Sequence, residues 1–157
     1  MYRITLTKKH KQFVYLGVAI FWMLLIFSFS SQNGTTSGGL STKVLQTLGD
    51  FFRVDIVNSD YYETFQLLIR KGAHMFEYFM LAIWLYLFWY HTTFKDQARI
   101  FAFLSSFLYA CTDEVHQLFI ADRAGQVQDV LIDTTGIVVA MLLFPILHHH
   151  LYHRKDT

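Results

Sequence analysis

The chain has 157 residues, of which 54% are hydrophobic and 18% aromatic, whereas only 16% are charged. This charged fraction is lower than the quarter usual in soluble domains, and the length suits a single domain over residues 1–157. The net charge of +1, without a basic stripe, argues against a nucleic-acid-binding protein, and the lone Cys111 excludes a disulfide within the chain.

Four apolar segments of about the length of a membrane-spanning helix follow one another along the chain. The first, residues 13–29, carries no charge and is not followed by a small-residue cleavage site, so we interpret it as a retained helix rather than a cleaved signal. Helices suit all four segments, because a segment in lipid must close its backbone hydrogen bonds internally. We therefore predict an all-α polytopic membrane protein, a bundle of four transmembrane helices at about residues 13–31, 73–90, 98–121 and 127–147.

The stretch between the first two predicted spans has two parts. A polar, glycine-containing piece covers residues 30–39, and apolar residues then recur at helical spacing over residues 40–52. This spacing predicts an amphipathic helix on the outer membrane interface, although a surface helix packed over the bundle would show the same pattern. Asp60 followed by Glu63 is typical of a helix start, so the second helix is expected to begin beside them.

The basic residues predict the orientation of the four spans. The N-terminal tail, the loop of residues 91–99 and the C-terminal tail would share one side and hold eight lysines and arginines, against five on the other side. The positive-inside rule therefore places both termini in the cytoplasm. Of the twelve acidic residues, all but Asp96 and Asp156 then lie in the outer loops or the outer halves of the helices.

Polar residues within or beside the predicted spans share one depth and form the candidate site. Because the chain reverses direction at each span, the ends of the first and third helices meet the starts of the second and fourth. A charge in hydrocarbon costs about 2.5–3.5 kcal/mol, so these side chains are expected to line a polar cavity that opens outward. They are Ser31, Gln32, Lys71, His74, Glu77, Tyr78, Asp113, Glu114, His116, Gln117, Arg123, Asp129 and Asp133.

The charge balance of this cavity indicates chemistry or transport. Five carboxylates face the two cations Lys71 and Arg123, which leaves a charge of −3 when the histidines are neutral. Protonated acids, protonated histidines, a bound cation or water must relieve this excess. Lys71 and Arg123 suit the phosphate or carboxylate of a substrate headgroup, and interfacial anchoring to lipid phosphates would explain them equally well.

Catalytic roles are predicted from residue type and helical spacing. We expect His116 to act as the general base, with Asp113 or Glu77 as its carboxylate partner. The other catalytic candidates are His74, Glu114, Asp129 and Asp133, and the other substrate-binding candidates are Gln117, Tyr78, Ser31 and Gln32. Ser31 could also be a nucleophile, although a serine at a helix end is more often a cap.

A divalent metal is a further alternative for the same residues. His74, Glu77 and His116 could ligate zinc or another transition metal, because imidazole and carboxylate groups suit these ions. A hydrogen-bonded structural pair would explain the spacing of His74 and Glu77 as well.

At these positions the sequence resembles the VanZ-like family of bacterial membrane proteins. The resemblance rests on four blocks in the family's order: FSSQ at 29–32, RKGAHMFEY at 70–78, DEVHQLF at 113–119, and RAG at 123–125 followed by DVLIDTTG at 129–136. Ala121 and Asp122 stand where the family often has a proline–glycine turn. The resemblance implies a protein of the bacterial cell membrane, whose founding relative is linked to reduced susceptibility to the glycopeptide antibiotic teicoplanin; it assigns no catalytic residue.

We expect the outward cavity to act on membrane lipids or lipid-linked cell-envelope precursors by acid–base or metal-assisted chemistry, with lower susceptibility to glycopeptide antibiotics such as teicoplanin as a cellular consequence. The alternative is a non-catalytic membrane protein that binds lipid or antibiotic. A proton-coupled carrier would also use buried acids, but the inner halves of the four predicted spans are nearly uncharged and provide no polar path to the cytoplasm.

Overall fold

The structure, a computed structural model, describes residues 7–121, 123 and 125–153, which fold into helices and contain no strand. The all-α prediction is thus confirmed. Arg3, Arg154 and Lys155, which contribute to the predicted orientation, and Asp122 and Ala124 beside Arg123 lie outside the described residues. The elements are α1 (Lys8–Ser30), α2 (Gly34–Phe52), α3 (Tyr62–Tyr90), the 3-10 helix η1 (Lys95–Gln97), α4 (Ala98–Gln117) and α5 (Val127–His153).

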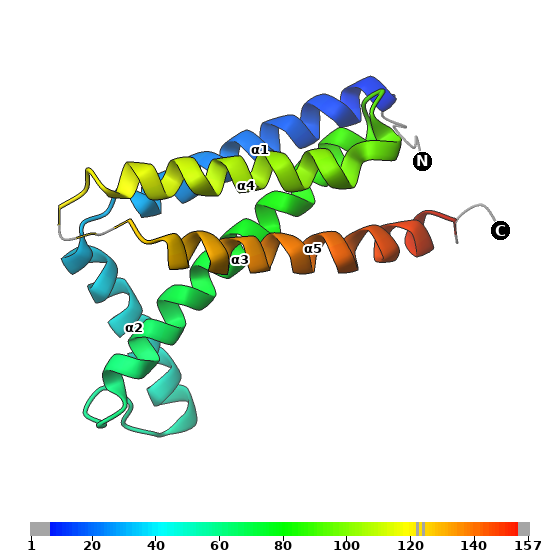
Figure 1. Ribbon diagram of the computed structural model, residues 1–157. Coiled ribbons are helices and arrows are strands. Elements are labelled where there is room, and N and C mark those ends of the chain that lie inside the picture. The colour runs from blue at the N-terminus through cyan, green and yellow to red at the C-terminus, as the bar shows by residue number, and fades with distance from the viewer. Residues whose placement is uncertain (1–6, 122, 124, 154–157) are drawn as a thin grey trace.

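The longest helix, α3, is the centre of the bundle. It packs against α1, α2, α4 and α5, and α4 also packs against α5. In Figure 1, α1, α4 and α5 extend along one direction while α3 crosses them, and both ends of the described chain lie at the same end of the bundle. Small buried residues such as Ala82, Ala102 and Ala140 let the helices approach closely.

Two long-range hydrogen bonds hold α1 in the bundle. The indole Nε1 of Trp22 donates to the carbonyl of Glu77 on α3 at 2.9 Å, and the hydroxyl of Tyr109 on α4 donates to the carbonyl of Met23 at 2.7 Å. Both bonds lie away from the chain connections, so they fix how far α1 slides along its neighbours. The carboxyl end of α1 is thereby placed beside α3 and α4.

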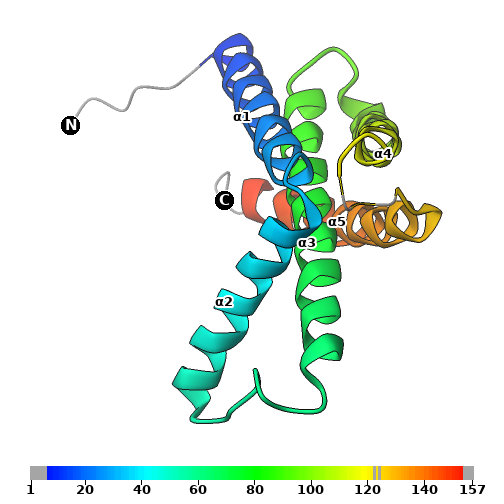
Figure 2. The same cartoon turned by 90° about the vertical axis from the view of Figure 1, so that its left-hand side faces the viewer.

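α2 and the first part of α3, residues 62–72, form an arm that projects to one side of the bundle (Figure 2). Leu45 of α2 is 2% exposed, and the hydroxyl groups of Thr42 and Tyr62 lie 2.6 Å apart. Gln66 of α3 donates to Thr42 Oγ1 at 2.8 Å. α2 therefore packs on α3, as a surface helix would, while its position relative to a membrane stays a prediction.

Several helix boundaries differ from the prediction. α2 begins at Gly34 rather than near residue 40, because the side chain of Asn33 caps it by accepting a hydrogen bond from the Thr36 N–H at 2.9 Å. α3 begins at Tyr62, beside Asp60 and Glu63 as predicted, although its N-cap residue Tyr61 makes no side-chain capping bond. α4 ends at Gln117 and the chain turns over residues 118–121, whereas α5 continues through the histidines to His153.

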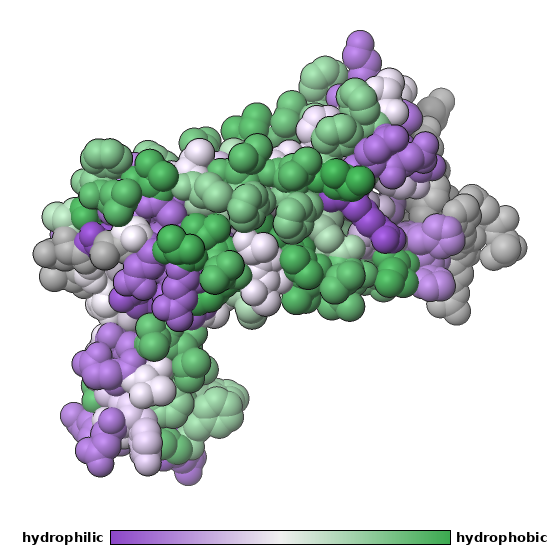
Figure 3. All heavy atoms as spheres, in the orientation of Figure 1, coloured by the Kyte–Doolittle hydropathy of each residue, from purple (hydrophilic) through white to green (hydrophobic). Residues whose placement is uncertain are grey.

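The surface of the bundle is rich in exposed apolar side chains. α1 and residues 127–150 of α5 each contain an apolar stretch long enough to cross a membrane. Only 17% of the residues in the stretch of α1 and 33% of those in the stretch of α5 are buried. A core helix of a soluble protein meets the same length and composition criteria, but it would be mostly buried. Figure 3 shows a broad hydrophobic band over the bundle, between hydrophilic surfaces at its ends and on the arm.

α3 and α4 contain no stretch that is as long and as apolar as those of α1 and α5. The reason is their composition: α3 carries several tyrosines and tryptophans besides Arg70 and Lys71, and α4 ends in acidic and amide residues. The described residues thus contain two candidate spans, one in α1 and one in α5. The predicted bundle of four transmembrane helices is therefore not confirmed.

The backbones of α3 and α5 approach each other closely at Gly136. A Cβ atom at this position would lie 2.2 Å from the carbonyl oxygen of Met75, whereas a real side chain requires more than 3 Å. Only glycine therefore permits this packing. The contact is one helical turn from Asp133 on α5 and next to His74 on α3.

We expect Gly136→Ala to lower the free energy of unfolding by about 1–3 kcal/mol, because the added methyl group forces α5 away from α3. Thermal unfolding of the protein in detergent micelles measures the change. Gly17→Ala is the matched control, since nothing lies within 4 Å of a Cβ at that position of α1. Equal melting temperatures for the two variants would contradict this account of the α3–α5 contact.

Candidate functional site

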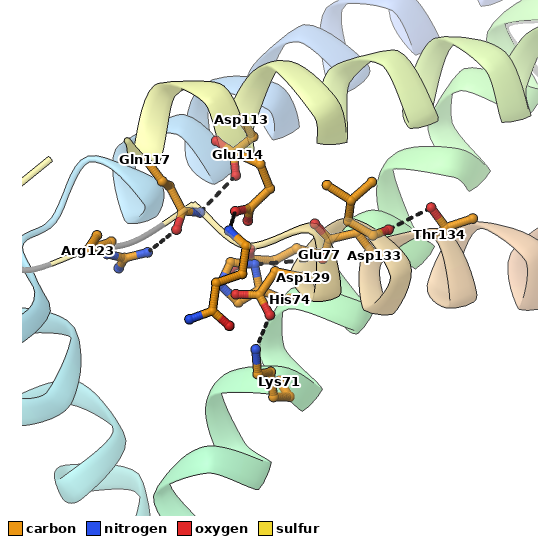
Figure 4. Close-up of polar contacts among 12 residues, drawn as sticks. Lys71, His74, Glu77, Asp113, Glu114, Gln117, Arg123, Asp129, Asp133 and Thr134 are labelled. Carbon is orange, nitrogen blue, oxygen red and sulfur yellow. Dashed lines mark hydrogen bonds and ion pairs between the residues drawn. The ribbon is translucent and has the colours of Figure 1, made fainter. Parts of the chain in front are cut away.

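The candidate residues gather at one end of the bundle, where α1 and α4 end, α5 begins and the middle of α3 passes (Figure 4). This is the end away from the described termini. The arrangement follows from the alternating helix directions and from the close α3–α5 contact. The residues nevertheless form several distinct groups rather than one continuous cluster.

An ion pair joins the starts of the polar segments of α3 and α5. Lys71 Nζ donates to Asp129 Oδ1, and the two side chains are 23% and 13% exposed. Lys71 thus neutralises a carboxylate of the protein, so it is not a free cation for a substrate. The pair also fixes the rotation of α5 relative to α3.

His74 and Asp133 form the second group, one turn deeper along both helices. Nδ1 of His74 lies 3.7 Å from Oδ1 of Asp133, and the Asp133 side chain is completely buried. Neither oxygen of Asp133 has a hydrogen-bond partner among the described residues, and neither has Nδ1 of His74. A carboxylate behind Nδ1 orients an imidazole and stabilises its protonated form, which leaves Nε2 for a ligand. At 3.7 Å the two groups are close enough for an electrostatic contact but not hydrogen-bonded.

A chain of polar contacts connects the end of α4 with the following loop. Gln117 Nε2 donates to Asp113 Oδ2 at 3.4 Å, and Arg123 Nη1 donates to Gln117 Oε1 at 3.4 Å. Arg123 Nη2 also donates to the carbonyl of Phe29 at the end of α1, at 3.3 Å. Burial, with a contribution from nearby Arg70, lowers the pKa of Arg123, yet an arginine stays charged at neutral pH.

Glu114 anchors the α4–α5 loop. Its Oε2 accepts a hydrogen bond from the backbone N–H of Gln126 at 2.8 Å, while Oε1 is buried without a partner in the described part of the chain. A Cβ at Gly125 would lie 2.5 Å from the Glu114 carbonyl oxygen, so glycine is needed for the loop to pass this close to α4. Glu114 therefore has a structural role in presenting Arg123.

His116 does not contact the carboxylates that we expected as its partners. Its Nε2 lies 3.2 Å from Ser31 Oγ, and its ring stacks on Phe27 at 4.6 Å between centroids. Ser31 Oγ also donates its one proton to the carbonyl of Phe27 at 2.7 Å. In the Ser31–His116 contact Nε2–H must therefore be the donor, which is the wrong direction for a base that activates a serine. The pair joins α1 to α4.

The main cavity of the site has a volume of about 220 Å³ and lies between α2, α3 and the end of α1. Of the sequence-predicted candidates, Gln32, His74, Glu77 and Arg123 line it. Glu77 is the single carboxylate in the described lining, and it interacts electrostatically with Asp113 and Arg123. The cavity is therefore less acidic than the composition of the whole end of the bundle suggests.

Several residues of this cavity were not predicted from the sequence. Arg70 lies four residues before His74 and seven before Glu77, a spacing that could have placed it on their face. The sequence contains no comparable pattern for the α2 residues of the lining, because they reach the cavity only through the fold of the arm. The lining that α2 and its neighbours add is Phe29, Ser30, Ser37, Leu40, Ser41, Val44, Ile69 and Ala73.

Tyr78 lies below the cavity in the core. It is fully buried, its hydroxyl group has no hydrogen-bond partner among the described residues, and its ring is 6.2 Å from that of Tyr109. Tyr78 therefore does not line the cavity, and its proposed contact with substrate finds no support there.

Metal ligation by His74, Glu77 and His116 would require the three side chains to converge. The described residues contain no group of three or more histidine, cysteine or acidic side chains arranged to hold a metal ion. His116 belongs to the pair with Ser31, while His74 and Glu77 line the cavity. The chemistry that the geometry supports is therefore that of the imidazole, carboxyl and guanidinium groups.

A comparison with protein families matches residues 14–148 to the model described as VanZ/LLP1. The matched range includes all the site residues described above. No curated protein and no solved structure gives a significant match to this chain.

We expect Lys71→Met to lower the free energy of unfolding by about 3 kcal/mol, because it leaves Asp129 as a largely buried charge without its partner. Adding Asp129→Asn should restore most of the loss, since the uncompensated charge is then removed. Unfolding in detergent micelles measures both variants, with the exposed Lys43→Met on α2 as the control. An unchanged stability of Lys71→Met would show that the ion pair does not hold α3 and α5 together.

Proposed function

Because the chain belongs to the VanZ/LLP1 family, we propose that it is a four-span membrane protein that acts on a lipid or lipid-linked cell-envelope molecule at the outer face of the bacterial cell membrane. The observation that carries the proposal is the composition of the main cavity. Arg70 and Arg123 supply positive charge, His74 and Glu77 supply acid–base groups, and α2 supplies an apolar wall.

The cavity suits an anionic headgroup attached to an apolar body. Guanidinium groups bind phosphate and carboxylate groups with two parallel hydrogen bonds. Nε of Arg123 is buried and has no partner among the described residues, so this guanidinium keeps hydrogen-bonding capacity. Leu40 and Val44 of α2 offer contact to the apolar part of the same molecule.

The size of the cavity limits how much of a lipid enters it. Sites for complete drug-sized ligands usually measure about 300–1,000 Å³, whereas this cavity measures about 220 Å³. A phosphate-bearing headgroup fits such a volume, and the acyl or prenyl chains must remain outside. This division agrees with a site next to the hydrophobic band of the surface.

In this proposal His74 replaces His116 as the general base. Asp133 behind Nδ1 orients the ring and stabilises the charge that forms when Nε2 accepts a proton from a hydroxyl group or a water molecule. Glu77 faces the same cavity and, as the carboxylic acid, can donate its own proton to the group that leaves when the bond in the headgroup breaks. Arg70 and Arg123 would stabilise negative charge on the headgroup during the transfer.

A second candidate function is binding without catalysis. It is favoured by the partners of the other carboxylates, because Asp129, Asp113 and Glu114 are engaged by groups of the protein. A protein that covers lipid-linked precursors in this way would lower the exposure of their headgroups to glycopeptide antibiotics such as teicoplanin. Such a binder needs Arg70 and Arg123 but not the proton chemistry of His74.

The lipid and precursor profile of producing cells distinguishes the two candidates. We expect the wild type to change the abundance of at least one anionic lipid or lipid-linked precursor, and His74→Ala and Glu77→Gln to abolish the change at equal membrane levels. His10→Ala and Glu63→Gln are matched controls outside the cavity. A profile that His74→Ala leaves like the wild type's would refute acid–base catalysis, and retained binding by that variant would favour the binder.

Labelling with a membrane-impermeant maleimide tests the four-span arrangement. In a Cys111→Ser background, Asp60→Cys in the arm should be labelled in intact cells, because the arm is expected on the outer face. Thr93→Cys in the loop after α3 should be labelled only after lysis. Both positions are exposed in the structure, so a reversed pattern would overturn the proposed orientation.

A further inference from the structure

A second polar cavity, of about 270 Å³, lies at the other end of the bundle, beside the described C-terminal part of α5. Its polar lining comes from three helices: Tyr86 and Tyr90 of α3, Arg99 of α4, and His148, His149 and His150 of α5. The site proposed above does not include any of these residues. Their side chains are nearly all hydrogen-bond donors, and the described lining contains no carboxylate.

Aromatic packing fixes the walls of this cavity. The ring of His148 lies 4.8 Å from that of Tyr90 and 5.8 Å from that of Tyr86, both in edge-to-face geometry. Pro145, which also lines the cavity, is buried inside α5, where it removes one backbone N–H and prevents a regular helical bond. The cavity is thus walled by aromatic rings of α3 and α5 and by this proline.

Two cations lie at the same cavity. Arg99 lines it, and Nζ of Lys95 lies 4.9 Å from the centroid of the Tyr90 ring. The segments 7–12, 91–99 and 145–153, which form this end, contain one acidic residue, Asp96. An anion would therefore find charge and hydrogen-bond donors there with little competition from carboxylates.

We propose that this second cavity binds the phosphate group of an anionic ligand, with Arg99 as the principal contact. An arginine matches phosphate with its planar fork of donors, and the hydroxyl groups of Tyr86 and Tyr90 extend the set. The phosphate can come from a phospholipid headgroup in the leaflet at this end or from a soluble phosphate. Both sources share the chemistry, and the experiment separates them.

Native mass spectrometry of the delipidated full-length protein in detergent tests the proposal. Phosphatidylglycerol and phosphatidylcholine are added at equal concentration to the wild type, Arg99→Gln, Tyr90→Phe and the control Lys43→Gln, which removes the same charge from the arm. A second arm adds inorganic phosphate, alone in a thermal-shift measurement and as a competitor of phosphatidylglycerol. Each comparison is repeated in an Arg123→Gln background, because the first cavity is itself proposed to bind an anionic headgroup and would otherwise mask a loss at the second.

We expect phosphatidylglycerol to be retained over phosphatidylcholine. In the Arg123→Gln background, Arg99→Gln should weaken this retention roughly tenfold, the effect of one lost charge-assisted contact. Lys43→Gln should retain the lipid like the wild type, and Tyr90→Phe should lie between. Stabilisation by inorganic phosphate that depends on Arg99 assigns a soluble ligand, whereas its absence beside Arg99-dependent lipid retention assigns the lipid. Equal behaviour of Arg99→Gln, Lys43→Gln and the wild type toward both probes would overturn the proposal.

Discussion

The contact of α5 with the backbone of α3 at Gly136 is the constraint on which the polar end of this protein depends. Because no side chain separates the two helices there, the residues one and two turns away on α5 reach those on α3 directly. Asp133 meets His74 and Asp129 meets Lys71 in register along the same interface. A wider spacing would leave Asp129 and Asp133 without these partners on α3. The site is therefore a consequence of helix packing, and its geometry and the stability of the fold are coupled.

The polar groups at this end of the bundle are of two kinds, those with partners within the protein and those without. Lys71–Asp129, Gln117–Asp113 and the Gln126 N–H to Glu114 contact satisfy carboxylates within the protein and hold the loop that carries Arg123. Asp133, Nδ1 of His74 and Nε of Arg123 are instead buried without hydrogen bonds among the described residues. Buried polar groups left unpaired are costly, so they occur where a ligand or a proton completes them. Oε1 of Glu114 and the hydroxyl of Tyr78 are also buried without a partner among the described residues, so an unpaired atom alone does not mark a functional group. His74 and Arg123 differ from these two residues because they also line the main cavity.

Much of the fold could be predicted from the sequence, because helical periodicity and the length of apolar segments determine where α1, α3, α4 and α5 lie. The alternating direction of the helices also predicted which polar residues share one end of the bundle. It did not predict which of them pair, because pairing depends on how each helix is rotated. His116 faces α1 and meets Ser31, while His74 meets Asp133. Spacing along one helix predicts a shared face but not the helix which that face meets.

The contribution of α2 to the site was hidden for a similar reason. Its apolar stripe indicates an amphipathic helix, yet the stripe alone does not show whether it meets lipid, solvent or the bundle. The start of α2 depends on a single capping residue, Asn33. The glycines that follow Asn33 disfavour a helix and so do not predict that α2 begins there. The arm, and with it the wall of the main cavity, required three-dimensional information.

The small volume of the main cavity also determines what such a protein can distinguish. Under the proposed function, a cavity with room for a headgroup alone would distinguish ligands by the charge and shape of their polar end. Lipids that differ only in the length or unsaturation of their chains would then be equivalent ligands, whereas lipids with different headgroups would not.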